Sequence, residues 1–234
     1  MFRKSHFTVL AALAAVAGLS IMSVGNASAN MIQNGDFSAN ASSYTINPGY
    51  SDYNTTQWAP NPAAPTNWTI NSANVGINGS ATGFGNDFGP TSLTGVTDFA
   101  FIQTEGNYAS QSVATTVGQT YTLTYDGSGR AGDNAGSDVL EVILTDTTNN
   151  TQITTQTPAI AQTAFNAFAL TFTAPSASTN VEFLNNSPGS AGLNGTPTVD
   201  VSNVAMSAVP EPASVGLLGV GAMGLLLLKR RRTS

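Results

Sequence analysis

The chain has 234 residues, of which 41% are hydrophobic and only 9% are charged, and it contains no cysteine. Without cysteine there is no disulfide bond, no thiol nucleophile and no thiolate metal site. Between residues 30 and 208, twelve carboxylates accompany a single cation, Arg130, so this part has a net charge of −11. Such an excess of acid argues against nucleic acid and anionic lipid as partners, because both require Lys and Arg. Neutral glycans, and Ca²⁺ bound through carboxylates, remain compatible.

Residues 1–29 have the three parts of a secretory signal peptide. Two cations open the chain, residues 7–17 are apolar, and Ala27-Ser28-Ala29 offers an A-x-A cleavage site. An uncleaved membrane helix is the alternative, because weak hydrophobicity continues beyond the apolar run. The small residues Ala27 and Ala29 favour cleavage by signal peptidase. Cations near both ends of the chain mark the cytoplasmic side, which places the intervening domain outside.

From residue 30 onward, short runs of β-branched and aromatic residues alternate with clusters of Gly, Asn, Ser and Pro, which is typical of β-strands and turns. The expected strands are Met31–Phe37, Trp68–Ile70, Phe99–Thr104, Ser110–Thr116, Thr120–Asp126, Val139–Thr145, Thr151–Thr157, Ala167–Ala174, Asn180–Leu184 and Thr198–Met206. About ten strands separated by polar turns predict an all-β fold, a two-sheet antiparallel β-sandwich, with no helix between the two ends of the chain.

Two long loops are expected to interrupt the strands, at Ser38–Asn67 and Asn78–Gly95. Loops of this length in a compact domain are usually functional or disordered. Both contain aromatic residues, which argue against pure disorder.

The chain ends in three parts, residues 209–212, 213–228 and 229–232. They are Val209-Pro210-Glu211-Pro212, an uncharged apolar run, and the cations Lys229, Arg230, Arg231 and Arg232. The apolar run predicts a single transmembrane helix of about 24 Å, which is short against about 30 Å of hydrocarbon. The cations hold its end on the cytoplasmic side. On hydrophobicity alone, a permanent membrane anchor and a processed segment fit equally well.

Pro210-Glu211-Pro212, the apolar run and the Arg-rich tail together resemble the PEP-CTERM sorting signal of bacterial exported proteins. The resemblance implies a bacterial producer that exports polysaccharide, and a membrane exosortase that removes the tail. It implies an inner-membrane anchored form, transient or permanent, and then a cell-surface or extracellular location. The expected organisation is a signal peptide (1–29), a β-sandwich domain (30–208) and a sorting signal (209–234).

Four short motifs in the central domain resemble those of galactose-binding-like jelly rolls, the fold of many carbohydrate-binding modules. They are Asn34-Gly35-Asp36-Phe37, Pro65-Thr66-Asn67-Trp68, Gly118-Gln119-Thr120-Tyr121-Thr122-Leu123 and Val199-Asp200-Val201-Ser202-Asn203-Val204. The resemblance implies a jelly-roll sandwich and a sugar ligand.

The same resemblance implies a structural Ca²⁺ between the opening segment and the last strand, where Asp36 and Asp200 occupy the matching positions. Hard oxygen ligands suit Ca²⁺. The family usually has a further acid just after the opening Phe, but this chain has Ser38. The alternative is that Asp36 is a turn residue beside Gly35 and Asp200 an exposed strand residue.

Glycan contact is expected from aromatic side chains, on which sugar rings stack. Tyr50, Tyr53 and Trp58 in the first loop are the candidates, and the alternative is that they pin the loop to the sandwich. Trp68, Tyr121, Phe168 and Phe172 are expected in the core.

Arg130, the only cation of the domain, has two interpretations. It forms an ion pair with Asp126 or Asp133, or it binds a sugar hydroxyl or a uronate. The ion pair is the favoured one.

No catalytic residues are expected. The only histidine, His6, leaves with the signal peptide, so Ser-His and Cys-His catalysis are excluded. Glycoside hydrolysis needs two carboxylates, and Glu105, Glu141 and Glu182 are present. Their alternative interpretation, as solvated charges at strand edges, is favoured. The sequence therefore predicts an exported structural or adhesive protein associated with exopolysaccharide, with a discrete carbohydrate-binding module as the alternative and a glycan hydrolase as a remote one.

Overall fold

The structure is a computed structural model that describes residues 29–39, 51–52, 65–71, 74–79, 89–132, 138–188 and 197–210. Ala29–Val209 form one compact unit. The expected signal segment up to residue 28 and the apolar run 213–228 lie outside the described residues. Across the described ranges, no helix has the length and apolar character needed to cross a membrane.

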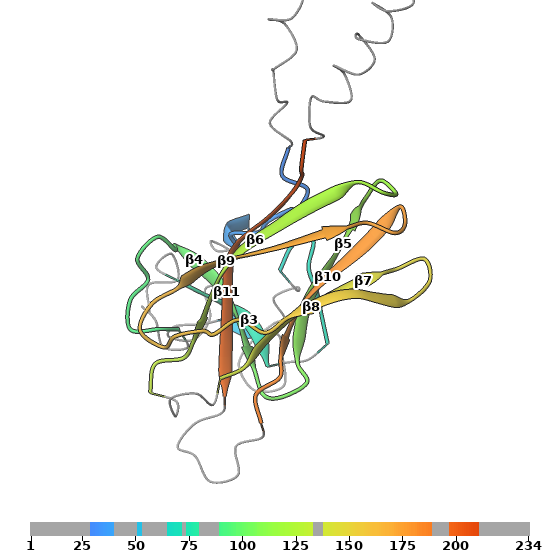
Figure 1. Cartoon of the computed structure of the whole chain (residues 1–234). Coiled ribbons are helices and arrows are strands. Elements are labelled where there is room, and N and C mark those ends of the chain that lie inside the picture. Colours follow the sequence, from blue (N-terminus) through green and yellow to red (C-terminus); the bar gives the residue numbers. More distant parts are fainter. Residues whose placement is uncertain are drawn as a thin grey trace, which may run out of the picture. The chain divides into compact units, whose positions relative to one another are not determined.

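The described strands form two sheets (Figure 1). In spatial order, the six-stranded sheet A consists of β1 (Ser51–Asp52), β3 (Val75–Gly79), β4 (Asp98–Gln103), β11 (Thr198–Ala208), β6 (Thr120–Gly129) and β9 (Asn166–Thr173). The five-stranded sheet B consists of β2 (Thr69–Ile70), β5 (Tyr108–Ala114), β10 (Ser178–Asn185), β7 (Leu140–Asp146) and β8 (Thr151–Gln156). All pairs of neighbouring strands are antiparallel. The predicted all-β, two-sheet antiparallel sandwich is confirmed, in an arrangement consistent with a jelly roll.

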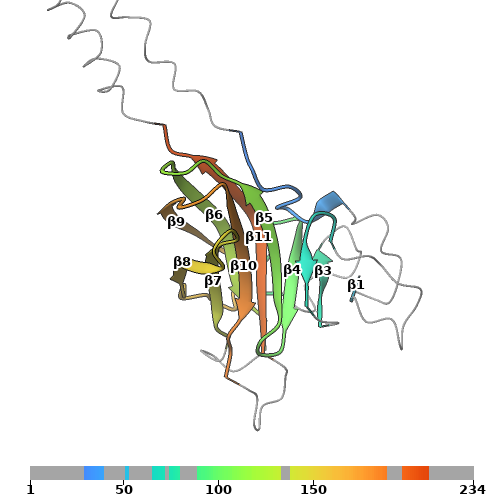
Figure 2. The ribbon, with the colours of Figure 1, turned by 90° about the vertical axis from the view of Figure 1, so that its right-hand side faces the viewer.

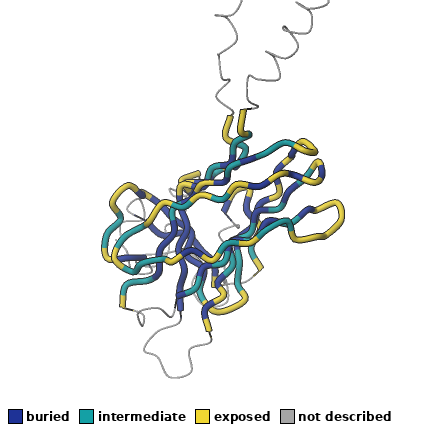
Figure 3. Tube along the Cα trace, in the orientation of Figure 1, coloured by how far each residue is buried: buried dark blue, intermediate teal, exposed yellow. Residues whose placement is uncertain are grey.

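The core lies between the two sheets, because alternate residues of each strand face inward. On β6, Tyr121, Leu123 and Tyr125 are at most 3% exposed. Tyr125 meets Phe183 of β10 at a ring-centroid distance of 5.3 Å, which joins sheet A to sheet B. Figure 3 shows buried segments inside the sandwich and exposed ones at the turns. The predicted core positions Trp68, Tyr121 and Phe172 are buried; Phe168 is half-buried.

The strand predictions need correction at three places. Met31–Phe37 is not a strand, because Asn34 and Phe37 adopt φ values of 52° and 58°, which belong to the left-handed region and interrupt extended backbone. β1 and β3, in contrast, were not predicted. β1 falls in the expected first loop, and the last two residues of β3 fall in the expected second loop. The other expected strands correspond to β2 and to β4 through β11, with ends shifted by a few residues.

The opening segment is nevertheless fixed to the sandwich. The Met31 N–H donates to the Met206 carbonyl at 2.8 Å, and the Val204 N–H donates to the Gly35 carbonyl at 2.9 Å. A Cβ at Gly35 would lie 2.0 Å from the Val204 carbonyl oxygen, so this close approach requires glycine.

The outer face of sheet A is partly covered. Phe99 and Phe101 on β4 alternate with the core residues of that strand and form a second cluster with Val96. Phe165 packs on Phe99 at a centroid distance of 5.4 Å. The segment before β4 and the segment before β9 are joined by a backbone hydrogen bond, in which the Ser92 N–H donates to the Thr163 carbonyl at 3.0 Å.

Candidate functional site

Many of the site residues predicted from sequence lie outside the described residues. These are Ala27, Tyr50, Tyr53, Trp58, Glu211, Pro212, Lys229, Arg230, Arg231 and Arg232. Ala29, Val209 and Pro210 are described and exposed.

The two ends of the sandwich domain lie side by side. The Asn30 Oδ1 atom accepts hydrogen bonds from the N–H groups of Met206 (2.9 Å) and Ile32 (3.0 Å). At the other end, the Val209 N–H donates to the Thr120 carbonyl at 2.8 Å, and the Gln119 side chain donates to the Val209 carbonyl at 2.8 Å. The last strand is therefore held in the sheet up to the first residue of the predicted sorting signal.

The two carboxylates expected to bind calcium have different environments. Asp36 is exposed, and its carboxylate accepts from the Ser38 hydroxyl at 2.9 Å and from the Ser38 N–H at 3.3 Å. Asp200 is fully buried on β11, where its Oδ2 accepts from the Ser128 hydroxyl at 3.3 Å. The alternative that made Asp200 an exposed strand residue is therefore wrong. In the described ranges, no group of three or more His, Cys, Asp or Glu side chains is arranged to hold a metal ion.

Arg130 directly follows β6 and is half-buried, and its backbone N–H donates to the Thr198 carbonyl at 3.2 Å. One of its two expected partners, Asp126, accepts a hydrogen bond from the Asn203 side-chain amide at 2.7 Å. The other, Asp133, lies outside the described residues.

The outer face of sheet B brings polar, charged and apolar side chains together. Core residues of β5, β10 and β7 alternate with residues that face away from the core. Cross-strand pairing places these outward residues in three rows, which are Tyr108–Leu184–Glu141, Ser110–Glu182–Ile143 and Ser112–Asn180–Thr145. Except for the buried Ser110 and the exposed Ser112, all are half-buried. We call these nine residues the sheet B face.

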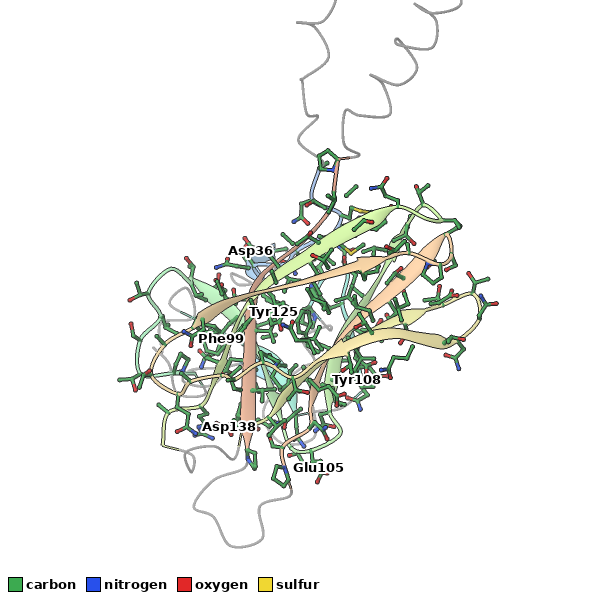
Figure 4. The ribbon with its side chains drawn as sticks, viewed as in Figure 1. Asp36, Phe99, Glu105, Tyr108, Tyr125 and Asp138 are labelled. Atoms are coloured by element: carbon green, nitrogen blue, oxygen red, sulfur yellow. The ribbon has the colours of Figure 1, made fainter. Side chains whose placement is uncertain are left out.

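The sheet B face combines four kinds of group. It has two carboxylates, an amide and several hydroxyls, and beside them the apolar surfaces of Tyr108, Leu184 and Ile143. Tyr108, labelled in Figure 4, lies at the start of β5. Its backbone N–H donates to the Asn71 side-chain oxygen at 2.9 Å. The Glu141 carboxylate accepts from the Thr155 hydroxyl at 2.9 Å and from the Asn186 amide at 2.8 Å. Glu141 is therefore held as an ordered acceptor.

Glu182 lies at the centre of this face and is electrostatically strained. Desolvation raises the pKa of Glu182, and the negative charge of the neighbouring Glu141 raises it further. A sugar hydroxyl or another donor placed here would stabilise the carboxylate. The face therefore favours ligands that donate hydrogen bonds and disfavours anions.

We expect Glu182→Gln to stabilise the free protein near neutral pH, by a few degrees at most because the side chain is half-exposed. Since its pKa is raised on folding, the folded state binds the proton more tightly than the unfolded chain. The contribution of Glu182 to the stability of the folded wild type is therefore greatest at low pH. It is lost as the pH rises through the folded pKa. Thermal melts from about pH 4 to about pH 8 should show a gain from the substitution that grows with pH. The matched control is Glu105→Gln, at an exposed turn residue. A variant less stable than the wild type at neutral pH would contradict this prediction.

The sequence indicated Glu141 and Glu182 only as isolated carboxylates, and it gave no signal for the rest of the sheet B face. Their proximity depends on the pairing of β10 with β7, which places Glu182 opposite Ile143 and Leu184 opposite Glu141. The alternating pattern of each strand identifies its outward residues, but not their neighbours across strands.

Fold and chain end together define an all-β sandwich protein with a sorting signal. Residues 208–232 match the family model for the PEP-CTERM protein-sorting motif, which confirms the prediction from Pro210-Glu211-Pro212 and the segments that follow. This motif implies an exported protein that is anchored in the membrane before an exosortase processes it. No curated protein matches the chain in sequence.

Several solved structures are similar to the sandwich, and they include carbohydrate-binding modules with jelly-roll folds. A CBM4 domain is 18% identical with a TM-score of 0.36, over 47% of this chain and 71% of that chain. A CBM22-1 xylan-binding domain from Paenibacillus barcinonensis is 10% identical with a TM-score of 0.43, over 71% and 96% of the two chains. TmCBM61, solved with beta-1,4-galactotriose, is 8% identical with a TM-score of 0.44, over 78% and 100%. At such low similarity, the ligand of each neighbour stays a property of that neighbour.

Proposed function

We propose that this protein is an exported component of the cell surface or extracellular matrix, with a structural or adhesive role in association with exopolysaccharide. The observation that carries the proposal is the sorting motif at residues 208–232, which implies exosortase-sorted export. The composition of the domain supports it, because a net charge of −11 between residues 30 and 208 disfavours nucleic acid and anionic lipid.

The sheet B face supports a neutral glycan as the ligand. Sugar hydroxyls donate well to carboxylate and amide oxygens, and the C–H faces of sugar rings pack on apolar side chains such as Tyr108 and Leu184. Glu141 and Glu182 would repel uronates and sulfated sugars. Neutral regions of an exopolysaccharide are therefore the preferred partner of this face.

A discrete carbohydrate-binding module with one defined glycan is the second candidate. Its binding residues would be Tyr50, Tyr53 and Trp58 of the first loop together with Arg130, as the sequence predicted. It differs from the first proposal in specificity, since a single polymer would be retained.

The experiment is co-sedimentation of residues 30–209 with the producer's own exopolysaccharide and with neutral and acidic polymers. Tyr108→Ala is expected to weaken retention on neutral polymers about tenfold, which corresponds to ~1.4 kcal/mol. Its melting temperature should stay close to that of the wild type, because Tyr108 is half-exposed. Val117→Ala, at a 65% exposed side chain in the β5–β6 turn, is the control.

Other outcomes separate the alternatives. Loss of retention on Trp58→Ala with an unchanged melt, while Tyr108→Ala has no effect, would assign binding to the first loop. A fall in melting temperature on Trp58→Ala would make that residue part of the packing. Release of reducing ends, lost on Glu182→Gln, would indicate hydrolysis, and intact polymer after long incubation would exclude it.

Calcium is tested in separate arms with EDTA and with added Ca²⁺. If EDTA lowers the melting temperature and Ca²⁺ restores it, the protein binds a structural cation. Loss of this response in Asp36→Asn would then assign Asp36 as a ligand. An unchanged melt in both arms would remove calcium from the proposal.

A further inference from the structure

The edges of the two sheets differ in how well they are protected from pairing with another chain. Within the described residues, sheet A ends in β1 and β9, and sheet B ends in β2 and β8. β1 and β2 have two residues each. β8 has six residues, and its ladder with β7 is interrupted by a register shift between Leu144 and Thr145. Very short edge strands and bulges are two devices by which proteins block edge-to-edge association.

β9 has neither of these devices. Its eight residues pair with β6 without a register shift, from Thr173 opposite Thr120 to Asn166 opposite Gly127. It contains no Pro and no charged residue. Its outward side chains include Ala169, Thr171 and Thr173, which are exposed. This strand is a regular and uncharged edge.

The free side of β9 carries backbone groups that point away from β6. The Ala174 N–H donates to the Gln119 carbonyl at 3.0 Å, so residue 174 faces the β6 side of the ladder. In an antiparallel ladder, the facing side alternates from residue to residue. Residues 167, 169, 171 and 173 therefore turn their N–H and C=O groups outward. The Ala169 carbonyl, one of these outward groups, accepts from the Gln156 side-chain amide of β8 at 3.4 Å. This bond agrees with the outward direction, and it would have to give way where a second strand pairs at residue 169.

The charge distribution favours a second copy of the chain on this side. No Asp, Glu, Lys or Arg occurs from Thr147 to Val181, a segment that includes both β8 and β9. Figure 2 shows these two strands together at one side of the sandwich, opposite β1 and β3. Two domains with a net charge of −11 repel each other, and this repulsion is weakest where both present an uncharged surface.

Association at the β9 edge would bury more of the apolar side chains that are half-buried there. Phe168 and Leu170 face the core but remain half-buried at the edge, and Phe168 stacks on Tyr125 at a centroid distance of 5.5 Å. A second strand beside β9 would cover them and remove apolar surface from water. On the outer face of sheet A, the hydroxyls of Thr171 and Thr122 lie 3.3 Å apart. The outer face beside this edge is therefore uncharged as well.

We propose that two copies of this chain associate through their β9 edges, by antiparallel pairing of β9 with the β9 of the second copy. Antiparallel pairing of identical strands has two-fold symmetry, so the contact closes at a dimer. It joins the two A sheets into one continuous sheet. The association does not depend on glycan binding, and it doubles the number of sheet B faces that one assembly presents to a polymer.

The test uses residues 30–209, which contain almost all of the compact unit, in sedimentation velocity from ~1 μM to ~1 mM without polysaccharide. We expect a concentration-dependent monomer–dimer equilibrium. Ala169→Pro removes an outward N–H and leaves the β6 ladder intact, and Ala169→Lys places like charges on the two strands that pair. Each is expected to weaken the dimer at least about tenfold. Thr124→Lys, with the same new charge on the exposed residue that pairs with Ala169 in β6, should still dimerise.

Thermal melts identify folded variants, and Ala169→Lys decides the outcome if the proline variant does not fold. A wild type that stays monomeric over the whole concentration range would overturn the proposal. A dimer that both Ala169 variants leave unchanged would also overturn it, because the contact would then lie elsewhere. If the β9 amides become protected from hydrogen exchange only when polysaccharide is added, the edge belongs to a glycan contact and the proposal again fails. Failure of glycan retention with an intact dimer affects only the proposed function.

Discussion

Trp68→Ala is expected to destabilise the sandwich domain by about 3–5 kcal/mol, the typical effect of removing a buried aromatic side chain. For a domain of this size the melting temperature should fall by roughly 6–20 °C. Trp68 is 4% exposed and contacts the rings of Phe37 and Phe183 at centroid distances of 5.1 Å and 6.0 Å. Its indole N–H donates to the Asn34 carbonyl at 3.0 Å. The substitution therefore opens a cavity where the opening segment packs on sheet B.

Two further variants separate the effect of losing the buried ring from that of losing the indole hydrogen bond, and provide a surface control. Trp68→Phe retains most of the buried ring but removes the hydrogen bond to Asn34, so its effect should be smaller, about 1–3 kcal/mol. Val117→Ala, on an exposed turn, should leave the melt unchanged. Calorimetry or circular dichroism of residues 30–209 measures all three. A melt of Trp68→Ala within a degree or so of the wild type would show that the opening segment does not depend on this contact.

The strands of the central domain were predictable where their side chains alternate. Tyr121, Leu123 and Tyr125 face the core, and the Thr residues between them face outward, as the sequence of β6 indicated. The pattern is local, because one buried face is enough to produce it. β3 escaped prediction because its sequence, Val-Gly-Ile-Asn-Gly, is short and rich in residues that usually mark turns.

In the opening segment, by contrast, a strand was predicted where the structure has none. Met31–Phe37 contains enough apolar residues to suggest a strand, and Ile32 and Phe37 are indeed buried. Its backbone is set instead by tertiary contacts, chiefly the approach of Gly35 to the Val204 carbonyl. Burial without regular alternation is therefore a poor guide to strand conformation.

The sorting motif and the sheet B face also differ in how far they can be predicted from the sequence. The sorting motif is contiguous, with its proline pair, apolar run and cations in a fixed order, so the sequence alone was sufficient to predict it. The sheet B face is assembled from three strands that are distant in sequence. Its composition depends on register, which a single sequence does not specify.

Ending the chain at Val209 is expected to abolish membrane retention and exosortase processing completely. The truncation removes nearly all of the sorting motif, including the apolar run 213–228 and the four terminal cations. It keeps the hydrogen bonds of Val209 to Thr120 and Gln119, so the sandwich should melt at the same temperature as before. The truncated protein should therefore be exported, folded and released rather than held at the membrane.

Cell fractionation and intact-mass measurement in an exosortase-containing producer check this prediction. The wild type should pass through a membrane-bound form and then lose the signal peptide and the C-terminal tail, whereas the truncated chain should lose the signal peptide alone. The charge-conserving control Arg231→Lys should be processed like the wild type, since the cytoplasmic stop depends on positive charge. A mature wild type that retains residues 213–232 would make the apolar run a permanent anchor. A truncated chain still found in the membrane fraction would mean that the sandwich domain itself binds there, contrary to what its net charge of −11 predicts.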